Sequence, residues 1–345
     1  MKKLMMSAIL LTSFNASAID FDVNVTTCGV AGTQNDLGTL CGQLKQEIKD
    51  LVGEDLPDAD IGEYGTGMAN ANGFAYKGLG SDYSNNFDYF VIRAAAGGAV
   101  DGDMDDAENA DGVGIGASAT IGINLDLLPV DKIGPVDLGK MDLFISMFSY
   151  DIDNDIDDNT NASGEISSFS VMARYQIVDG KEFIAGNMLE WGGIFLHTGF
   201  QRSSWDATIK ATFDDETAEI SGAQATFSDS QAKLTLETTT TTIPIEVSTY
   251  LRAGYIFTFF GGAGFDLVSG TSEVDIDLGG DISGTSGFDA ELTAGDSASG
   301  DADATNFRGF FGAQFNIPFV SVYAQMNKGL GNDLVGVNAG VKILW

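Results

Sequence analysis

Long apolar runs, histidine, cysteine and basic residues are all scarce in this chain of 345 residues. No run of about eighteen apolar residues occurs, so a transmembrane helix is not expected. The single histidine, His197, stands far from the two cysteines, which argues against a metal centre built from these ligands. Only 17 Lys and Arg accompany 50 Asp and Glu, a formal net charge of -33. Nucleic acid is therefore not an expected partner, because phosphate binding needs a basic patch.

The first eighteen residues have the composition of an export signal. They hold two lysines, an apolar run over Leu4–Leu11 and the small-residue triplet Ala16-Ser17-Ala18. This pattern predicts a secretory signal peptide over residues 1–18, removed before Ile19. In an oxidising compartment, Cys28 and Cys41 are then predicted to form a disulfide, with two free buried thiols as the alternative.

From Phe87 onward, apolar residues recur with a period of two. The clearest case is GVGIGASATIGINLD, in which apolar residues alternate with Gly, Ser, Thr and Asn. Alternating strands of this length are typical of tilted, membrane-spanning β-strands. The twelve candidate strands are Phe87–Ala99, Val113–Leu125, Met141–Tyr150, Phe169–Ile177, Leu189–Gly199, Trp205–Phe213, Ala218–Phe227, Thr242–Phe257, Phe259–Val268, Phe307–Phe315, Phe319–Met326 and Leu334–Trp345. The pair Trp205–Phe213 and Ala218–Phe227 is the weakest, which leaves ten strands as an alternative.

The connections between these strands alternate between long and short. Long acidic segments follow the first strand from Asp101, follow the third from Asp151, and fill residues 269–305. If the short connections face the periplasm, the first strand runs up, the last runs down, and the strand number is even. The last strand must pair with the first, because an open sheet edge is not tolerated in hydrocarbon.

With its signal peptide, its alternating strands and its ending VGVNAGVKILW, the chain resembles the bacterial outer-membrane β-barrel proteins of the porin-like class over residues 87–345. The resemblance implies an all-β, antiparallel up-and-down transmembrane β-barrel of about twelve strands, within a range of about 10–14. It also implies a Gram-negative outer membrane, contact with lipid and lipopolysaccharide, and handling by the barrel assembly machinery. In that class the terminal aromatic residue is an assembly signal, here Trp345 in place of the more usual phenylalanine.

Residues 19–86 form an N-terminal segment, periplasmic or plugging the barrel. Leu37, Leu40, Cys41, Leu44, Ile48 and Leu51 recur at helical spacing and predict one amphipathic helix. The glycine-rich stretch GEYGTGMANANGFAYKGLGSDY after it is predicted to be a loop. The sequence leaves open whether the helix plugs the lumen, lies at the periplasmic mouth or contacts a partner.

Several basic and polar residues share the polar register of the strands. A charge facing lipid costs about 2–4 kcal/mol at mid-depth, so these side chains are expected to point inward. They would line a pore, with Asp126, Asp142 and Asp266 as counter-charges, or pair with these acids and fill a narrow barrel. The predicted pore-lining residues are Arg93, Arg174, Arg252, Arg308, Lys342, Asn338 and Gln314.

The stretch DIDNDIDD resembles the start of a calcium-binding loop. The sixth and twelfth positions counted from Asp151 are Ile156 and Ala162, where an EF-hand needs Gly and Glu. Weak divalent cation binding by these acids stays an alternative to a solvated acidic loop, and no other cofactor is expected. The candidate cation ligands are Asp151, Asp153, Asp155 and Asp157.

Catalysis has little support. His197 lies near Ser203 and Ser204, but nothing marks an orienting third group or an oxyanion hole. The chain is therefore predicted not to be an enzyme.

The leading hypothesis is a passive diffusion pore for small hydrophilic solutes. The alternative is a structural or adhesive surface protein whose acidic extracellular loops contact another cell, matrix or lipopolysaccharide. The oligomeric state is left open.

Overall fold

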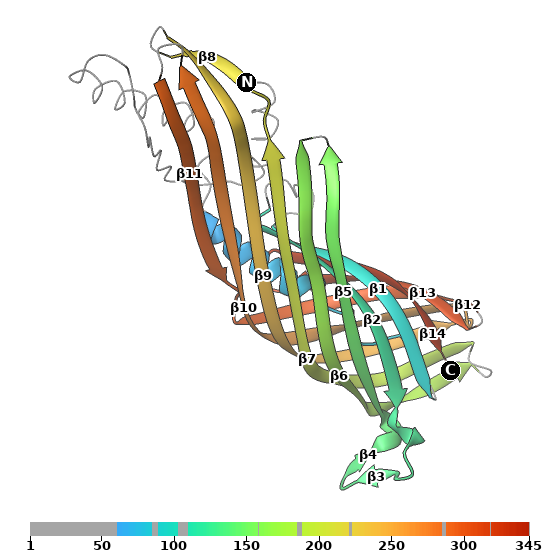
Figure 1. Cartoon of the computed structure of the whole chain (residues 1–345). Coiled ribbons are helices and arrows are strands. Elements are labelled where there is room, and N and C mark those ends of the chain that lie inside the picture. The colour runs from blue at the N-terminus through green and yellow to red at the C-terminus, as the bar shows by residue number, and fades with distance from the viewer. Residues whose placement is uncertain are drawn as a thin grey trace.

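The computed structural model describes residues 61–84, 89–102, 110–157, 159–184, 188–220, 223–284, 288–317 and 319–344. Most of them belong to one antiparallel sheet that closes into a ring (Figure 1). Within these ranges the one α-helix is α3 (Ile61–Ala75), which lies inside the ring. No helix in this part of the chain is both long and apolar enough to cross a membrane. The all-β barrel expected from the alternating pattern is confirmed.

Ten strands close the ring, because β1 pairs with β14 and β9 pairs with β10. The predicted pairing of the first strand with the last is therefore confirmed, with Arg93 opposite Lys342. In ring order the strands are β1 (Phe90–Asp101), β2 (Gly112–Asn124), β5 (Met141–Asp157), β6 (Thr160–Ile184), β7 (Leu189–Thr212), β9 (Ala223–Ala253), β10 (Phe257–Gly284), β12 (Thr305–Ile317), β13 (Val320–Gly329) and β14 (Leu334–Leu344).

The ring is smaller than twelve strands because the weak pair of candidate strands adds none to it. Residues 205–212 continue β7 without a break, so Leu189–Gly199 and Trp205–Phe213 are parts of one strand. Residues 218–227 fall on β8 (Glu216–Ile220) and on the start of β9, which lie outside the ring. Ten strands keep the even number expected for this architecture.

The two rims of the barrel differ in their connections. Short turns join β6 to β7, β9 to β10 and β12 to β13 at the rim where β14 ends. At the same rim, a small hairpin of β3 (Lys132–Ile133) and β4 (Val136–Asp137) connects β2 to β5. Strands extend far beyond the ring only at the opposite rim. Because bacterial barrels have short periplasmic turns and longer extracellular parts, we assign the opposite rim to the extracellular side.

Five neighbouring strands, β5, β6, β7, β9 and β10, rise far beyond the other five at the extracellular rim (Figure 1). Strand β11 (Phe288–Asp301) pairs with the upper part of β10, and β8 pairs with the start of β9. We call the described parts of residues 148–168, 203–241 and 268–301 the β-extension. The acidic segments predicted as loops after Asp151 and over residues 269–305 are therefore largely strands, and that prediction is wrong.

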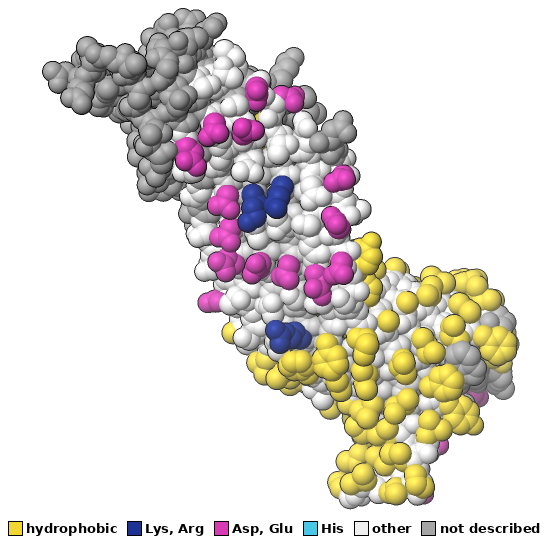
Figure 2. Space-filling view, viewed as in Figure 1, with side chains coloured by type: hydrophobic (Ala, Val, Ile, Leu, Met, Phe, Trp, Pro, Cys, Tyr) yellow, Lys and Arg dark blue, Asp and Glu magenta, His cyan; other side chains and the backbone are white. Residues whose placement is uncertain are grey.

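Along single strands, the outer face of the sheet is apolar in the barrel and polar in the β-extension, and the inner face changes in the opposite sense. In the lower part of β9, Ile245 and Val247 are exposed on the outside, whereas Glu246 between them is buried inside. Higher on the same strand, Glu237 is exposed on the outside and Leu236 is buried inside. Figure 2 shows the same change, an apolar band over the barrel and acidic side chains over the β-extension. The barrel thus lies in the outer membrane and the β-extension in water outside the cell.

Candidate functional site

Residues 61–84 occupy the lumen of the barrel, and we call them the plug. They consist of α3 and the irregular segment 76–84, which begins with hydrogen-bonded turns. Phe74, Lys77 and Asp82 are each at most 2% exposed. The prediction of a loop for this stretch is wrong for its first part, which is helical. The helix predicted over Leu37–Leu51 lies outside the described residues.

Glycines on β2 explain how a glycine-rich segment forms a helix inside the barrel. A Cβ added at Gly112 would collide with the backbone of Gly67, and one added at Gly114 with the backbone of Ala71. The helix and the strand are therefore in backbone contact. Glycine inside a helix costs about 1 kcal/mol relative to alanine, and this close packing offsets that cost. The glycines that alternate with apolar residues in β2 therefore also form the surface on which α3 packs.

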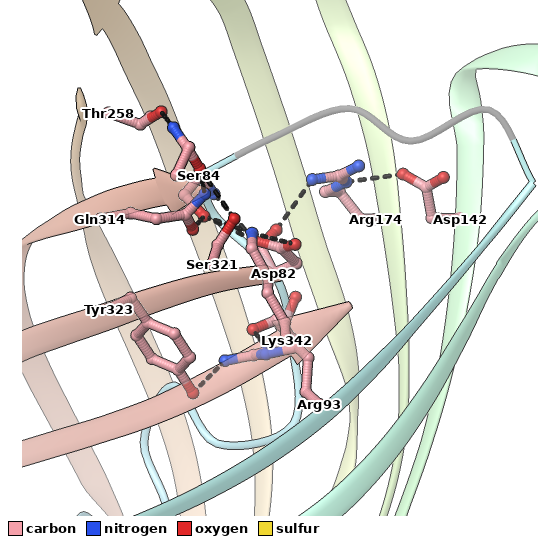
Figure 3. A network of polar contacts seen from close by, with 12 residues as sticks. Asp82, Ser84, Arg93, Asp142, Arg174, Thr258, Gln314, Ser321, Tyr323 and Lys342 are labelled. Atoms are coloured by element: carbon pink, nitrogen blue, oxygen red, sulfur yellow. Dashed lines mark hydrogen bonds and ion pairs between the residues drawn. The ribbon is translucent and has the colours of Figure 1, made fainter. Parts of the chain in front are cut away.

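The first of two charge clusters surrounds Asp82 (Figure 3). Lys342 Nζ donates hydrogen bonds to both carboxylate oxygens of Asp82, at 2.8 and 2.6 Å. Arg174 Nη1 donates to the Asp82 carbonyl at 2.8 Å, while its Nε pairs with Asp142 at 2.6 Å. Arg93 lies directly opposite Lys342 across the β1–β14 pair, so Asp82 compensates two adjacent positive charges that would otherwise repel.

Arg93 also binds the backbone of the plug. Its guanidinium donates to the carbonyls of Ser81 and Gly78, the latter at 3.3 Å, and to the Tyr323 hydroxyl at 2.5 Å. The Arg93 side chain is 3% exposed. Arg93 therefore binds backbone carbonyls of the plug and also lies beside the plug carboxylate Asp82.

The second cluster joins Lys77 and Tyr83 of the plug to three wall residues. Asp266 lies 3.5 Å from Lys77 Nζ and 3.0 Å from Arg308 Nε. Glu246 pairs with Arg308 and accepts a hydrogen bond from the Tyr83 hydroxyl at 2.7 Å. All five side chains are at most 2% exposed, so the charges compensate one another out of contact with water.

Six of the seven residues predicted to line the lumen are buried on the inner face. Five of these contact the plug, and Arg308 reaches it through Asp266 and Glu246. Besides Arg93, Arg174 and Lys342, Asn338 donates to the Lys77 carbonyl at 2.9 Å. Gln314 accepts from the Ser84 hydroxyl at 2.5 Å. Arg252 is half-buried and pairs with Glu190 at 3.1 Å. The inward register is as expected, and two of the three suggested counter-charges, Asp142 and Asp266, pair with wall arginines. That these residues line an open pore stays a prediction.

A small cavity lies between the plug and the wall. It measures about 10 Å³ and is lined by plug residues Tyr76, Leu79 and Gly80 and by Ser118 and Gln201 of the wall. That volume holds roughly one water molecule. The plug therefore packs closely against the wall at this position.

His197 belongs to the docking surface of the plug. Its Nδ1 lies 2.9 Å from Ser81 Oγ, its Nε2 lies 2.7 Å from Ser248 Oγ, and its ring lies 4.8 Å from that of Tyr83. Its hydrogen-bond partners are therefore not the two serines suggested by sequence proximity. Ser203 binds Asn72 of α3 at 3.2 Å.

The acids proposed as cation ligands lie on one strand instead of in a loop. Alternate residues of an extended strand are about 6.8 Å apart, so Asp151, Asp153 and Asp155 do not converge. Among the described residues, no group of three His, Cys, Asp or Glu could hold a metal ion. The Asp157 side chain, the signal peptide, Cys28, Cys41 and Trp345 lie outside the described residues.

A row of exposed carboxylates crosses the β-extension. Direct cross-strand pairing places Asp151 opposite Glu165, Glu165 opposite Asp206, Asp206 opposite Glu237, and Glu237 opposite Glu273. We call these five residues, exposed on the outer face, the acidic row. Partial desolvation, followed by Glu237 and Glu165, raises the pKa of Asp206 above its ordinary value. Sequence reasoning missed the row because it depends on the register of five strands that are far apart in the chain.

The solved structures similar to this chain are distant, with identities of 5–11% and TM-scores of 0.26–0.30. The translocator domain of the autotransporter NalP from Neisseria meningitidis is 11% identical, covers 79% of this chain and 92% of its own, and has a TM-score of 0.30. CarO from Acinetobacter baumannii is 9% identical, with coverages of 74% and 97% and a TM-score of 0.27. The CymD monoaromatic hydrocarbon channel is 5% identical, with coverages of 81% and 98% and a TM-score of 0.26.

A search of curated proteins finds no match. The family model described as Lsa36-like matches residues 23–345. Because that match spans the barrel, the plug and most of the preceding segment, the chain belongs to the Lsa36-like family.

Proposed function

We propose that this protein is a surface-exposed outer-membrane barrel with a closed lumen, whose β-extension attaches to cationic surfaces of other cells or of matrix. The acidic row is the observation that carries the proposal. It places five exposed carboxylates side by side on the part of the protein that stands outside the membrane. The barrel is then the anchor and the β-extension is the binding surface.

The plug supports a closed lumen. Removing it would leave Arg93, Arg174 and Lys342 without the contacts that Asp82 makes to each side of the lumen. Releasing the plug must break both charge clusters at once, together with the hydrogen bonds from Arg93 and Asn338 to its backbone. Two such clusters hold the plug, so we expect its spontaneous release to be rare.

The geometry of the acidic row supports a cationic partner. Like charges directly opposite each other destabilise a sheet by about 0.2–1 kcal/mol per pair. A partner carrying Lys or Arg would relieve this repulsion on binding. Attachment through exposed charges would also weaken with salt, because ionic strength screens such interactions.

The test uses a variant in which three central acids of the row are neutralised, Glu165→Gln, Asp206→Asn and Glu237→Gln. We expect binding of purified protein to a polylysine-coated surface to fall strongly, and the remaining binding to lose its salt dependence. A matched control removes the same charge at the periplasmic rim, with Asp126→Asn, Asp131→Asn and Glu182→Gln, all exposed. Unchanged binding by the first variant, or equal loss in both, contradicts the proposal.

A passive diffusion pore for small hydrophilic solutes is the second candidate. The observation that favours it is the basic, polar character of the wall behind the plug, formed by Arg93, Arg174 and Arg308. Such a wall suits a water-filled channel once the plug has left. Conductance steps from wild-type protein in a planar bilayer would favour this candidate over the closed barrel.

A further inference from the structure

The β-extension has an apolar inner face that the plug covers only in part. Leu236, Val274 and Ile276 are buried there against Met68, with Tyr64 beside them at the start of α3. One step further from the membrane, the inward-facing Ile209, Leu234 and Leu278 are half-buried. Ile209 lies directly opposite Leu234, and Leu278 lies opposite Ala232, the next inward-facing residue of β9 after Leu234. We call Ile209, Leu234 and Leu278 the upper inner face.

The plug crosses the lumen from outside to inside. Near its start, a Cβ added at Gly65 would lie 2.8 Å from the Gly300 nitrogen, at the extracellular end of the ring. At its other end, Ser84 contacts Lys342 and Gln314, near the periplasmic rim. Ile61, the first described residue, therefore lies at the extracellular end of the plug. Tyr64, one turn into α3, packs beside Leu236 and Val274 at the base of the upper inner face.

The sequence before Ile61 contains a matching surface. The helix predicted over Leu37–Leu51 has an apolar stripe that includes Leu40, Cys41 and Leu44, and its other side is charged. The nine residues 52–60 can span up to about 30 Å when extended. This linker is long enough to bring the stripe onto the upper inner face.

We propose that residues 19–60 are exported through the barrel to the outer surface, and that the apolar stripe of the helix over Leu37–Leu51 covers the upper inner face of the β-extension. The proposal rests on the proposed function in one respect, since it requires the plug to stay in the lumen. It adds a second component to the exposed surface, the N-terminal segment, which the chain itself provides.

Paired cysteine cross-linking tests the docking. In a Cys28→Ser background, Cys41 lies on the apolar stripe and is the one remaining cysteine. We add Leu234→Cys on the inner face or Lys233→Cys on the outer face, and treat intact cells with a short bismaleimide. The expected result is an intramolecular cross-link for Leu234→Cys and only background for Lys233→Cys.

A second pair of cysteine substitutions keeps the test decisive if one of the first variants does not fold. Ile209→Cys repeats the inner position and Lys210→Cys the outer one, and heat-modifiable migration in detergent gels reports folding of each. Equal cross-linking from both faces, or none from either inner site in folded protein, overturns the docking. Cross-linked dimers would assign the face to a second copy and overturn it as well.

Surface labelling tests the export separately. In a chain without Cys28 and Cys41, Asp55→Cys should react with a membrane-impermeant maleimide on intact cells. Asp131→Cys, in the connection carrying the periplasmic hairpin, should react only after permeabilisation. Labelling of Asp55→Cys only after permeabilisation overturns the inference, while conductance of the wild-type protein would instead count against the closed lumen. The two failures are therefore distinguishable.

Discussion

The barrel and the β-extension are built from the same strands, yet they expose opposite faces to water. In the barrel, the outer residues of β10 include Phe259 and Leu267, and the inner ones include Asp266. In the β-extension, the outer residues include Glu273, and the inner ones include Val274. The period of two continues through both regions. What changes is which side of the sheet contacts water, so polarity and not periodicity marks where the membrane ends.

A run of threonines on β9 lies at this change. Thr238, Thr240 and Thr242 are buried on the inner face, and the threonines between them lie on the outer face. Threonine is β-branched and so favours a strand, and its hydroxyl and methyl groups suit a polar or an apolar neighbour. The run lets one strand pass from the membrane into water without a break.

The largest expected effect comes from breaking the charge cluster of the barrel. Asp82→Ala leaves Arg93 and Lys342 adjacent and without the plug carboxylate. We expect about 3–5 kcal/mol of destabilisation, measured as a lower temperature for the shift in heat-modifiable migration. A second change, Lys342→Met, should restore part of the loss by removing one uncompensated charge. A variant as stable as the wild type would show that Asp82 does not hold the plug.

The matching change in the β-extension removes an apolar contact. Leu236→Ala deletes a buried side chain that packs on Met68, Val274 and Ile276. We expect the free energy of unfolding to fall by about 2 kcal/mol, the lower end of the range for such truncations. Proteolysis of the β-extension should become faster. The control, Leu251→Ala on the lipid-facing side, should leave that proteolysis unchanged. Equal effects from both would mean that the inner face of the β-extension is not a core.

The packing of α3 on β2 gives a third prediction, in which the expected destabilisation is similar or smaller. Gly114→Val forces a side chain into the backbone of Ala71 and should cost about 1–3 kcal/mol by overpacking. Its control, Gly309→Ala, meets no atom within 4 Å and should be neutral. Urea unfolding of the refolded protein in detergent measures both. If Gly114→Val behaves like Gly309→Ala, α3 is not seated on β2.

The smallest effect concerns the acidic row. The pKa of Asp206 is raised in the folded protein, so ionisation of this carboxyl lowers the free energy of unfolding. The loss is absent at pH values below the ordinary pKa of an aspartate. It develops as the pH rises from that ordinary pKa to the raised pKa of the folded protein. Asp206→Asn should therefore stabilise the β-extension at neutral pH and make no difference at acidic pH. Water screens these exposed groups, so we expect about 0.2–0.5 kcal/mol, measured by proteolysis at both pH values. Destabilisation at neutral pH would contradict like-charge repulsion in the row.

The sequence predicts what depends on local alternation. The lipid-facing residues, the closure of β1 on β14, the even strand number and the inward register of Arg93, Arg174 and Arg308 all follow from the period of two and the cost of a charge in lipid. These features need no knowledge of which strands are neighbours, apart from the closure itself.

The rest depends on long-range packing that no local pattern shows. Glycines in residues 61–75 argue against a helix unless the glycines of β2 are known to lie against it. The stretch VDIDL in β10 resembles an acidic loop unless its inner residues are known to face a core. The second of these could have been noticed, because Val274, Ile276 and Leu278 alternate with acids in the same period of two.

The most direct test of the closed lumen is planar-bilayer recording of the purified wild-type protein beside a variant lacking residues 61–84. We expect no conductance steps from the wild type. We expect regular steps from the deletion variant, whose folding is checked by heat-modifiable migration. Steps of equal size and frequency from both proteins would contradict a barrel closed by its own plug.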